Sequence, residues 1–102
     1  MLTSIAGQSV IVTGGSKGIG KGIAKVFAAR GANVVVAARG LADAEATANE
    51  IRAGGGTAIA HAADVSDWAS VEGLVARTLE AFGTVDVLCA NAGAFPQKKI
   101  IE

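Results

Sequence analysis

The sequence contains no tyrosine and only one cysteine, Cys89, among its 102 residues. A single cysteine cannot form an internal disulfide or a cysteine-cluster metal site. No two histidine, cysteine or carboxylate side chains show the spacing of metal ligands either. We therefore expect a protein without a bound metal, and a cytoplasmic location agrees best with this cysteine usage.

The chain also lacks an excess of either charge and any long apolar run. Nine basic residues balance nine acidic ones, which gives no support for binding to nucleic acid or to an acidic membrane surface. No stretch approaches the roughly 18 apolar residues of a membrane span. The first residues lack the basic and apolar regions of a secretory signal. With 51% apolar residues, the composition is that of one globular domain.

Strand-like and helix-like patterns alternate along the chain. Short, β-branched or apolar runs predict four strands, at residues 9–13, 34–38, 57–62 and 85–90. The first helix is expected over residues 18–30, followed by Gly31 as its left-handed cap. A second helix is expected to end near Gly54-Gly55-Gly56. A third helix, with Ser66 as its N-cap and Asp67 as a negative charge in its first turn, is expected to end at Gly83.

Apolar stripes predict which helix residues face the sheet. For the first helix they are Ile19, Ile23, Val26 and Phe27, and for the third they are Val71, Leu74, Val75, Leu79 and Phe82. The βαβαβαβ order with nearly continuous apolar strands predicts an α/β fold, a doubly wound parallel sheet of the Rossmann type with strand order 3-2-1-4. We expect residues 1–102 to be a single dinucleotide-binding domain that stops before a catalytic segment.

A glycine-rich turn separates the first strand from the first helix. It reads Thr13-Gly14-Gly15-Ser16-Lys17-Gly18-Ile19-Gly20. Helix N-termini present unpaired N–H groups and a partial positive charge, and glycines leave room for a phosphate to approach them. This turn therefore predicts a phosphate-binding site rather than an ordinary connection.

Two well-known phosphate loops fit the turn poorly. Lys21 stands where a P-loop lysine would be, but Gly22 replaces the hydroxyl residue that a P-loop needs for magnesium. The dinucleotide fingerprint G-x-G-x-x-G also fails, because Ile23 follows Gly18 and Gly20 at the last glycine position.

The pattern Thr13-Gly14-x-x-x-Gly18-x-Gly20 resembles the short-chain dehydrogenase/reductase family. Asp64-Val65 after the third strand resembles the family's adenine-binding aspartate, and Asn91-Ala92-Gly93 after the fourth resembles its N-N-A-G motif, with Ala90 at the first position. The resemblance implies that the backbone of Gly14, Gly18 and Gly20 reaches the pyrophosphate. It implies cofactor contacts for Ser16, Lys17, Ile19, Asp64, Val65, Asn91, Ala92 and Gly93 as well.

The end of the second strand predicts which nicotinamide cofactor is bound. A carboxylate there accepts hydrogen bonds from the ribose of NAD, but this chain has Ala38-Arg39. A guanidinium binds a 2′-phosphate through charge-assisted hydrogen bonds, and Lys17 can add a second positive charge. These residues favour NADP(H) over NAD(H).

No residue of this chain fits the role of the catalytic acid. In the resembling family the acid is a tyrosine, assisted by a lysine four residues later, a serine and a further asparagine, all C-terminal to this segment. We interpret His61 as a partly packed strand residue, Cys89 as core and Trp68 as a cover for the sheet edge. We therefore predict no catalytic residue within these 102 residues.

The resemblance implies an oxidoreductase that interconverts an alcohol and a carbonyl compound by hydride transfer. The glycine turn looks most like that of bacterial 3-oxoacyl-acyl-carrier-protein reductases, which implies a small-molecule or acyl-carrier-bound substrate and a homo-oligomer, a tetramer or dimer. The alternative is a stand-alone nucleotide-binding module or inactive fragment without catalysis.

Overall fold

The computed structural model describes residues 5–14 and 17–90. Strands and helices alternate without exception in this part of the chain. The strands are β1 (Ser9–Thr13), β2 (Asn33–Ala38), β3 (Thr57–Ala62) and β4 (Val87–Ala90), and the helices are α1 (Gly18–Ala29), α2 (Leu41–Ala53) and α3 (Trp68–Phe82).

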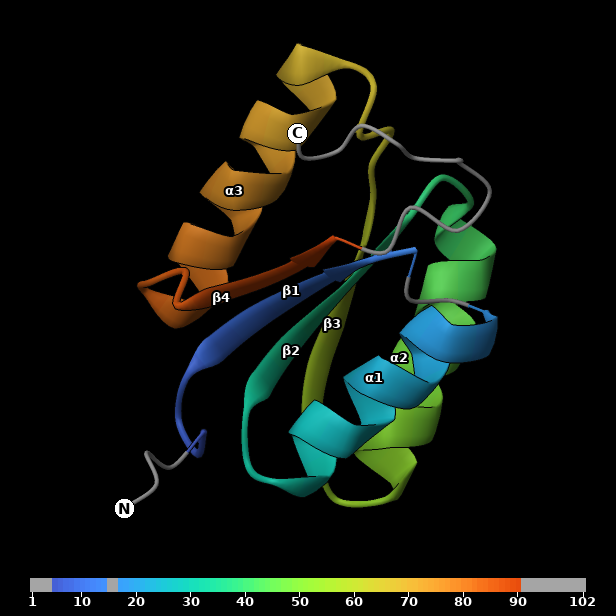
Figure 1. Cartoon of the computed structure of the whole chain (residues 1–102), viewed down its shortest axis with the longest axis vertical. Coiled ribbons are helices and arrows are strands. Elements are labelled where there is room, and N and C mark those ends of the chain that lie inside the picture. Colours follow the sequence, from blue (N-terminus) through green and yellow to red (C-terminus); the bar gives the residue numbers. More distant parts are fainter. Residues whose placement is uncertain (1–4, 15–16, 91–102) are drawn as a thin grey trace.

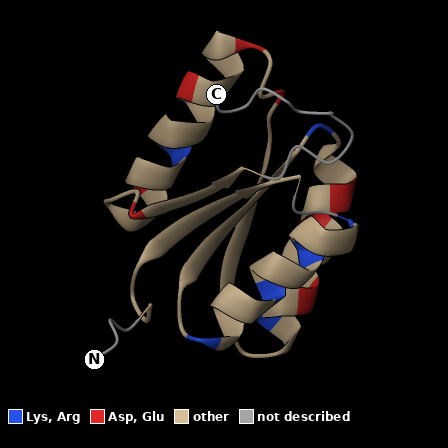
Figure 2. Cartoon of the chain, viewed as in Figure 1, with Lys and Arg blue, Asp and Glu red and all other residues tan. Residues whose placement is uncertain are grey.

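The four strands form one parallel sheet in the order β3-β2-β1-β4 (Figure 1). Val12 lies beside Val36 on one side and Cys89 on the other, so β1 is central. No strand carries a lysine, arginine, aspartate or glutamate, and charged residues lie on the helices and connections (Figure 2). The expected fold class and strand order are therefore confirmed. The sequence could predict them because parallel strands that are covered on both faces need uninterrupted apolar runs.

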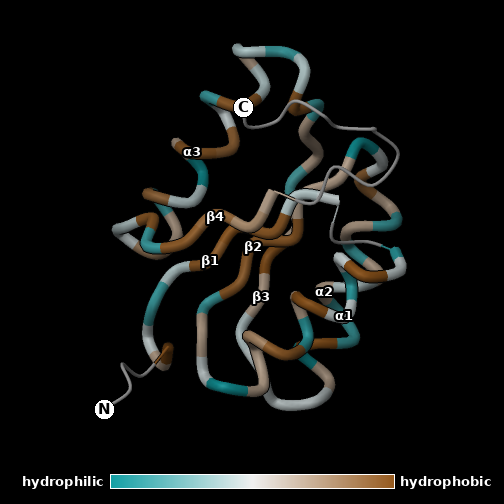
Figure 3. Tube along the Cα trace, in the orientation of Figure 1, coloured by the Kyte–Doolittle hydropathy of each residue, from teal (hydrophilic) through white to brown (hydrophobic). Residues whose placement is uncertain are grey.

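Helices cover both faces of the sheet. α1 and α2 lie together on one face and α3 lies on the other (Figure 1). Alternate strand residues supply the two cores, which Figure 3 shows as the apolar centre of the molecule. Val10, Val12, Val34 and Val36 pack toward α1 and α2, whereas Ile11, Val35 and Ala37 pack toward α3 with Leu74.

The buried face of α1 differs from the expected stripe. Ile23 and Phe27 pack against the core as predicted, but Ile19 and Val26 are exposed. Gly20, Ala24 and Ala28 are the buried residues of this helix. The prediction for Ile19 and Val26 is wrong because these small residues let the helix approach the sheet closely, and the larger side chains beside them point outward.

The same correction applies to α3. Leu74 is buried and Phe82 packs beside it, but Val75 and Leu79 are exposed, and Thr78 is buried in their place. The Thr78 hydroxyl donates to the carbonyl oxygen of Leu74 at 2.8 Å, which satisfies this polar group inside the core. No helix in the described ranges is both long enough and apolar enough to cross a bilayer.

Several local expectations about helix ends are confirmed. Gly31 and Gly83 follow α1 and α3 with φ angles of 91° and 83°, in the left-handed region that favours glycine. At α3 the N-cap is Asp67, whose carboxylate accepts a hydrogen bond from the backbone N–H of Ala69. The expected N-cap, Ser66, is wrong, because its hydroxyl donates to Asp64 instead. Trp68 is 72% exposed, so the expectation that it covers the sheet edge is wrong.

Strand β4 starts two residues later than expected, because Asp86 forms two hydrogen bonds with Ser9 ahead of the strand. The backbone N–H of Ser9 donates to the Asp86 carboxylate at 2.8 Å, and the Asp86 N–H donates to the Ser9 carbonyl at 2.9 Å. Asp86 therefore fastens the start of β4 to β1. Cys89 is half-buried against the α1–α2 core, as expected of a core residue.

Candidate functional site

All four strands end at the same edge of the sheet. The register pairs Thr13, the last residue of β1, with Ala37 and with Ala90. The following residues stay beside one another: the N–H of Gly14 donates to the Ala37 carbonyl and the N–H of Ala63 to the Ala38 carbonyl, both at 2.8 Å. In sheets of this kind ligands bind outside the carboxyl ends, where the chain order reverses, which here is between β1 and β4.

The glycine turn has the backbone geometry that its sequence predicts. Gly14 and Gly18 have φ angles of 66° and 55°, which other residues rarely adopt. A Cβ added to Gly18 would meet no atom within 4 Å, so the space in front of this residue is open. Gly20 is buried at the first turn of α1. Ser16 and Gly15 lie outside the described residues.

Among the described residues, no side chain caps the N-terminus of α1. Its N-cap residue, Lys17, makes no side-chain cap hydrogen bond, and the first turn carries no acid. At α3, by contrast, the Asp67 carboxylate accepts a hydrogen bond from the N–H of Ala69. The first turn of α1 therefore keeps its N–H donors and partial positive charge available for an anion, and these residues fit a pyrophosphate.

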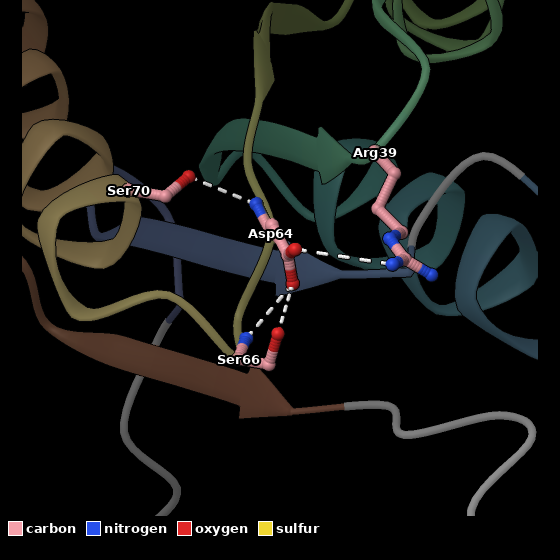
Figure 4. A network of polar contacts seen from close by, with 4 residues as sticks. All are labelled: Arg39, Asp64, Ser66 and Ser70. Carbon is pink, nitrogen blue, oxygen red and sulfur yellow. Dashed lines mark hydrogen bonds and ion pairs between the residues drawn. The ribbon is translucent and has the colours of Figure 1, made fainter.

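Arg39 and Asp64 face each other across this edge (Figure 4). Arg39 follows β2 and Asp64 follows β3, and the guanidinium Nη2 lies 3.8 Å from the Asp64 Oδ2. The Arg39 side chain is 82% exposed, so its remaining donors are open to solvent. The structure thus brings together Arg39, the residue predicted to bind the 2′-phosphate, and Asp64, the residue predicted to bind the adenine.

Asp64 is held by its own loop. Its Oδ1 accepts hydrogen bonds from the Ser66 hydroxyl at 2.6 Å and from the Ser66 N–H at 3.0 Å, and its own N–H donates to the Ser70 hydroxyl at 2.8 Å (Figure 4). The Ser66 hydroxyl, its N–H and the charge of Arg39 together lower the pKa of Asp64 below its ordinary value. The carboxylate is therefore ionised and fixed in orientation at neutral pH.

Lys17 forms an ion pair with a carboxylate that the sequence did not identify as part of the site. Its Nζ lies 3.9 Å from the Oδ2 of Asp43, which belongs to the first turn of α2. A Cβ added to Gly40 would lie 3.6 Å from the same oxygen, so the carboxylate turns back toward the residue after Arg39. An acid in the first turn of a helix is a common feature, which is why this position gave no functional signal in the sequence.

Two exposed apolar side chains belong to the same edge. Ile19 follows Gly18 at the start of α1, and Val65 follows Asp64. Both are more than half exposed and pack against neither core. Their exposure leaves both side chains accessible at this edge, where the resemblance implies cofactor contacts.

The predicted residues after β4 lie outside the described ranges. These are Asn91, Ala92 and Gly93. The strand that leads to them is well placed: the Thr13 hydroxyl donates to the Cys89 carbonyl oxygen at 3.4 Å, across the β1–β4 junction. Burial raises the pKa of the Cys89 thiol, which agrees with a packing role for this cysteine.

Metal-ligating side chains do not cluster among the described residues. These residues contain no group of three histidine, cysteine, aspartate or glutamate side chains that could hold a metal. His61 is half-buried in β3, as expected of a packed strand residue. A groove lined by Lys25, Glu50 and Gly54 to Gly56 lies at the amino ends of the strands, at the edge opposite the predicted site.

Comparisons with known proteins agree with this geometry. The family model described as short chain dehydrogenase matches residues 8–102. The chain is 52% identical over 93 residues to "L-rhamnose 1-dehydrogenase (NAD(P)(+))" of Azotobacter vinelandii, covering 87% of this chain and 36% of that protein. It spans only about a third of the length of the curated relatives that it matches.

Solved structures give the same result. A hydroxysteroid dehydrogenase from Escherichia coli superimposes with a TM-score of 0.85 at 36% identity, over 86% of this chain and 37% of that one. A metagenomic short-chain oxidoreductase in complex with NADP gives 0.78 at 41% identity, over 84% and 39% of the two chains. On the family match, the fold and these relatives, the chain belongs to the short-chain dehydrogenase family.

Proposed function

We propose that this chain is the cofactor-binding portion of an NADP(H)-dependent oxidoreductase that interconverts an alcohol and a carbonyl compound. Membership of the short-chain dehydrogenase family supports an oxidoreductase. The observation that carries the preference for NADP(H) is the positive charge at the end of β2, where the chain reads Ala38-Arg39 and has no carboxylate at the position that binds the ribose of NAD.

The residues of the glycine turn would hold the pyrophosphate. The N–H groups near Gly14, Gly18 and Gly20 would supply donors at the N-terminus of α1, and Ser16 and Ile19 would complete this side of the site. When bound, the nicotinamide ring supplies or accepts the hydride. The chain's own contribution is to bind and orient the cofactor and to recognise its charge.

The other half of the cofactor would lie along the ends of β2, β3 and β4. Arg39 and Lys17 would bind the 2′-phosphate, because both are exposed cations at this edge. The residues that would contact the adenine and the adjoining ribose and nicotinamide side are Asp64, Val65, Asn91, Ala92 and Gly93. The fixed orientation of Asp64, set by Ser66 and Ser70, supports a role in recognition.

The substrate is proposed at the level of its reacting group, a secondary alcohol or ketone or an aldehyde. The names of the relatives point to different substrates, a sugar in one case and a steroid in the other. A sugar substrate is favoured over a 3-oxoacyl carrier thioester by the 52% identity to the rhamnose enzyme. We also propose a homo-oligomeric protein in the cytoplasm.

The test of this proposal is a charge reversal at Arg39 in the full-length protein. Calorimetric titration of Arg39→Asp should show that NADPH binding weakens by at least about tenfold, the order of one charge-assisted hydrogen-bonded pair. NADH binding should change by less than about twofold to threefold, because NADH lacks the 2′-phosphate.

The matched control is Arg30→Asp, which makes the same charge change at the exposed C-terminal end of α1. It should leave the ratio of the two affinities unchanged. Equal loss of NADPH and NADH in Arg39→Asp would contradict the assignment. Binding of both cofactors without turnover of any alcohol or carbonyl compound would favour a stand-alone nucleotide-binding module.

A further inference from the structure

Both cations of the proposed 2′-phosphate site are engaged by carboxylates. Lys17 Nζ lies 3.9 Å from Asp43 Oδ2, and Arg39 Nη2 lies 3.8 Å from Asp64 Oδ2. We propose that Asp43 is a specificity-determining residue that opposes the 2′-phosphate, weakens NADP(H) selectively and so keeps NAD(H) usable. This inference rests on the proposed function of Arg39 and Lys17.

The two carboxylates differ in how firmly they are held. Asp64 is fixed by two hydrogen bonds from Ser66, so it serves its own loop as well as Arg39. For Asp43, Lys17 is the only ion-pair partner found in the part of the chain that the structure describes. The Asp43 side chain is also more exposed, at 60% against 43% for Asp64. The charge of Asp43 therefore lies beside the proposed phosphate site and is paired there with Lys17 alone among the described cations.

Asp43 also occupies the N-terminus of the helix that begins beside Arg39. The N-cap of α2 is Gly40, which has no side chain to cap the helix, and Asp43 is the acid of the first turn. A negative charge at this position takes up the favourable interaction with the partial positive charge of the helix end. A 2′-phosphate next to Arg39 would therefore gain little from the partial positive charge of this helix end, because Asp43 already neutralises it. The phosphate would also be repelled by the Asp43 carboxylate.

The size of the effect follows from the exposure of the pair. Exposed ion pairs are worth little because water screens them, so the penalty on the phosphate amounts to about three- to fivefold in the dissociation constant. Salt shortens the range of such interactions to about 3 Å at 1 M, so the penalty should fade as ionic strength rises.

The experiment compares Asp43→Asn with the wild type in the full-length protein. Calorimetric titrations use NADPH and NADH, and also adenosine 2′,5′-bisphosphate and 5′-AMP, which differ only in the 2′-phosphate. We expect Asp43→Asn to tighten NADPH and the bisphosphate about three- to fivefold at low salt, with NADH and 5′-AMP unchanged within about 1.5-fold. The gain should disappear in 1 M NaCl.

Glu45→Gln is the matched control, because Glu45 lies on the same helix and is paired with Arg52 at 3.6 Å. An equal gain in Glu45→Gln, or equal changes for the phosphorylated and unphosphorylated ligands, would overturn the role of Asp43. Asp43→Ser removes the same charge with a different side chain and should give the same result. Its melting temperature shows whether the variant is folded. If Arg39→Asp removes the NADPH preference while both Asp43 variants behave as the wild type, only this inference fails. If wild-type protein shows no preference that Arg39→Asp can remove, the proposed function fails and this inference fails with it.

Discussion

At the scale of single residues, the candidate site depends on residue types that can be identified in the sequence itself. A glycine is needed where φ is positive, and Gly14 and Gly18 have such angles. The absence of an acid before Arg39 is likewise visible in the sequence. Asp43 could not be found in this way, because its contact with Lys17 joins two different helix starts and depends on how α1 and α2 are placed.

Gly56 is a residue whose importance also comes from packing alone. A Cβ at this position would lie 2.8 Å from Cγ2 of the buried Ile51 and 3.2 Å from Cβ of Ala28. Gly56→Ala should therefore lower the free energy of unfolding by about 1–3 kcal/mol, the usual cost of overpacking. Urea denaturation of the full-length protein, followed by circular dichroism, measures this change.

Gly73→Ala is the matched control for the same substitution. Gly73 lies within α3, and an added Cβ would meet only the His61 Nε2, at 4.0 Å. Alanine is the better helix former, so this variant should gain about 0.5–1 kcal/mol. The crowding argument is wrong if the two variants change stability in the same direction.

At the scale of elements, the sequence predicted the strands better than the helix faces. Three strands agree with the expected bounds within one residue, because fully buried strands are continuous apolar runs. The apolar stripes of α1 and α3 were misassigned at Val26 and Leu79. Hydrophobicity alone cannot show that small residues such as Ala24 and Ala28 form the surface that approaches the sheet.

One acid of α2 forms ion pairs with two lysines of α1. Glu50 of α2 accepts from Lys25 at 2.6 Å and from Lys21 at 2.9 Å. These two lysines lower the pKa of Glu50 from 4.5 to about 2. A carboxylate with a lowered pKa stabilises the folded state above its ordinary pKa, and this contribution is lost as the pH falls from 4.5 through about 2.

Glu50→Gln should therefore lower the urea midpoint at pH 7, and the difference from wild type should shrink between pH 4.5 and about 2. The midpoints of the two proteins, measured across this range, provide the test. Glu80→Gln removes an exposed i,i+3 partner of Arg77 at 3.6 Å and should shift the midpoint less. A midpoint difference for Glu50→Gln that does not depend on pH would rule out the ion pairs as its cause.

At the scale of the whole molecule, the order of elements predicted the fold and explains why the candidate site residues lie at one edge of the sheet. Alternating strands and helices with right-handed crossovers allow few arrangements, and the order β3-β2-β1-β4 is the expected one. Because the strands are parallel, residues as far apart as Gly14, Arg39 and Asp64 meet at one edge. The substrate could not be predicted, since related proteins with different substrate names share this portion of the chain.

The central claim is that one cradle at this edge binds a dinucleotide that carries a 2′-phosphate. A crystal structure of the full-length protein with NADPH tests it most directly. We expect the pyrophosphate to accept hydrogen bonds from N–H groups of the Gly14–Gly20 turn, and the 2′-phosphate to lie within hydrogen-bond distance of Arg39, at about 2.7–2.9 Å. A bound cofactor whose 2′-phosphate points away from Arg39, or whose pyrophosphate does not contact the glycine turn, would contradict the claim.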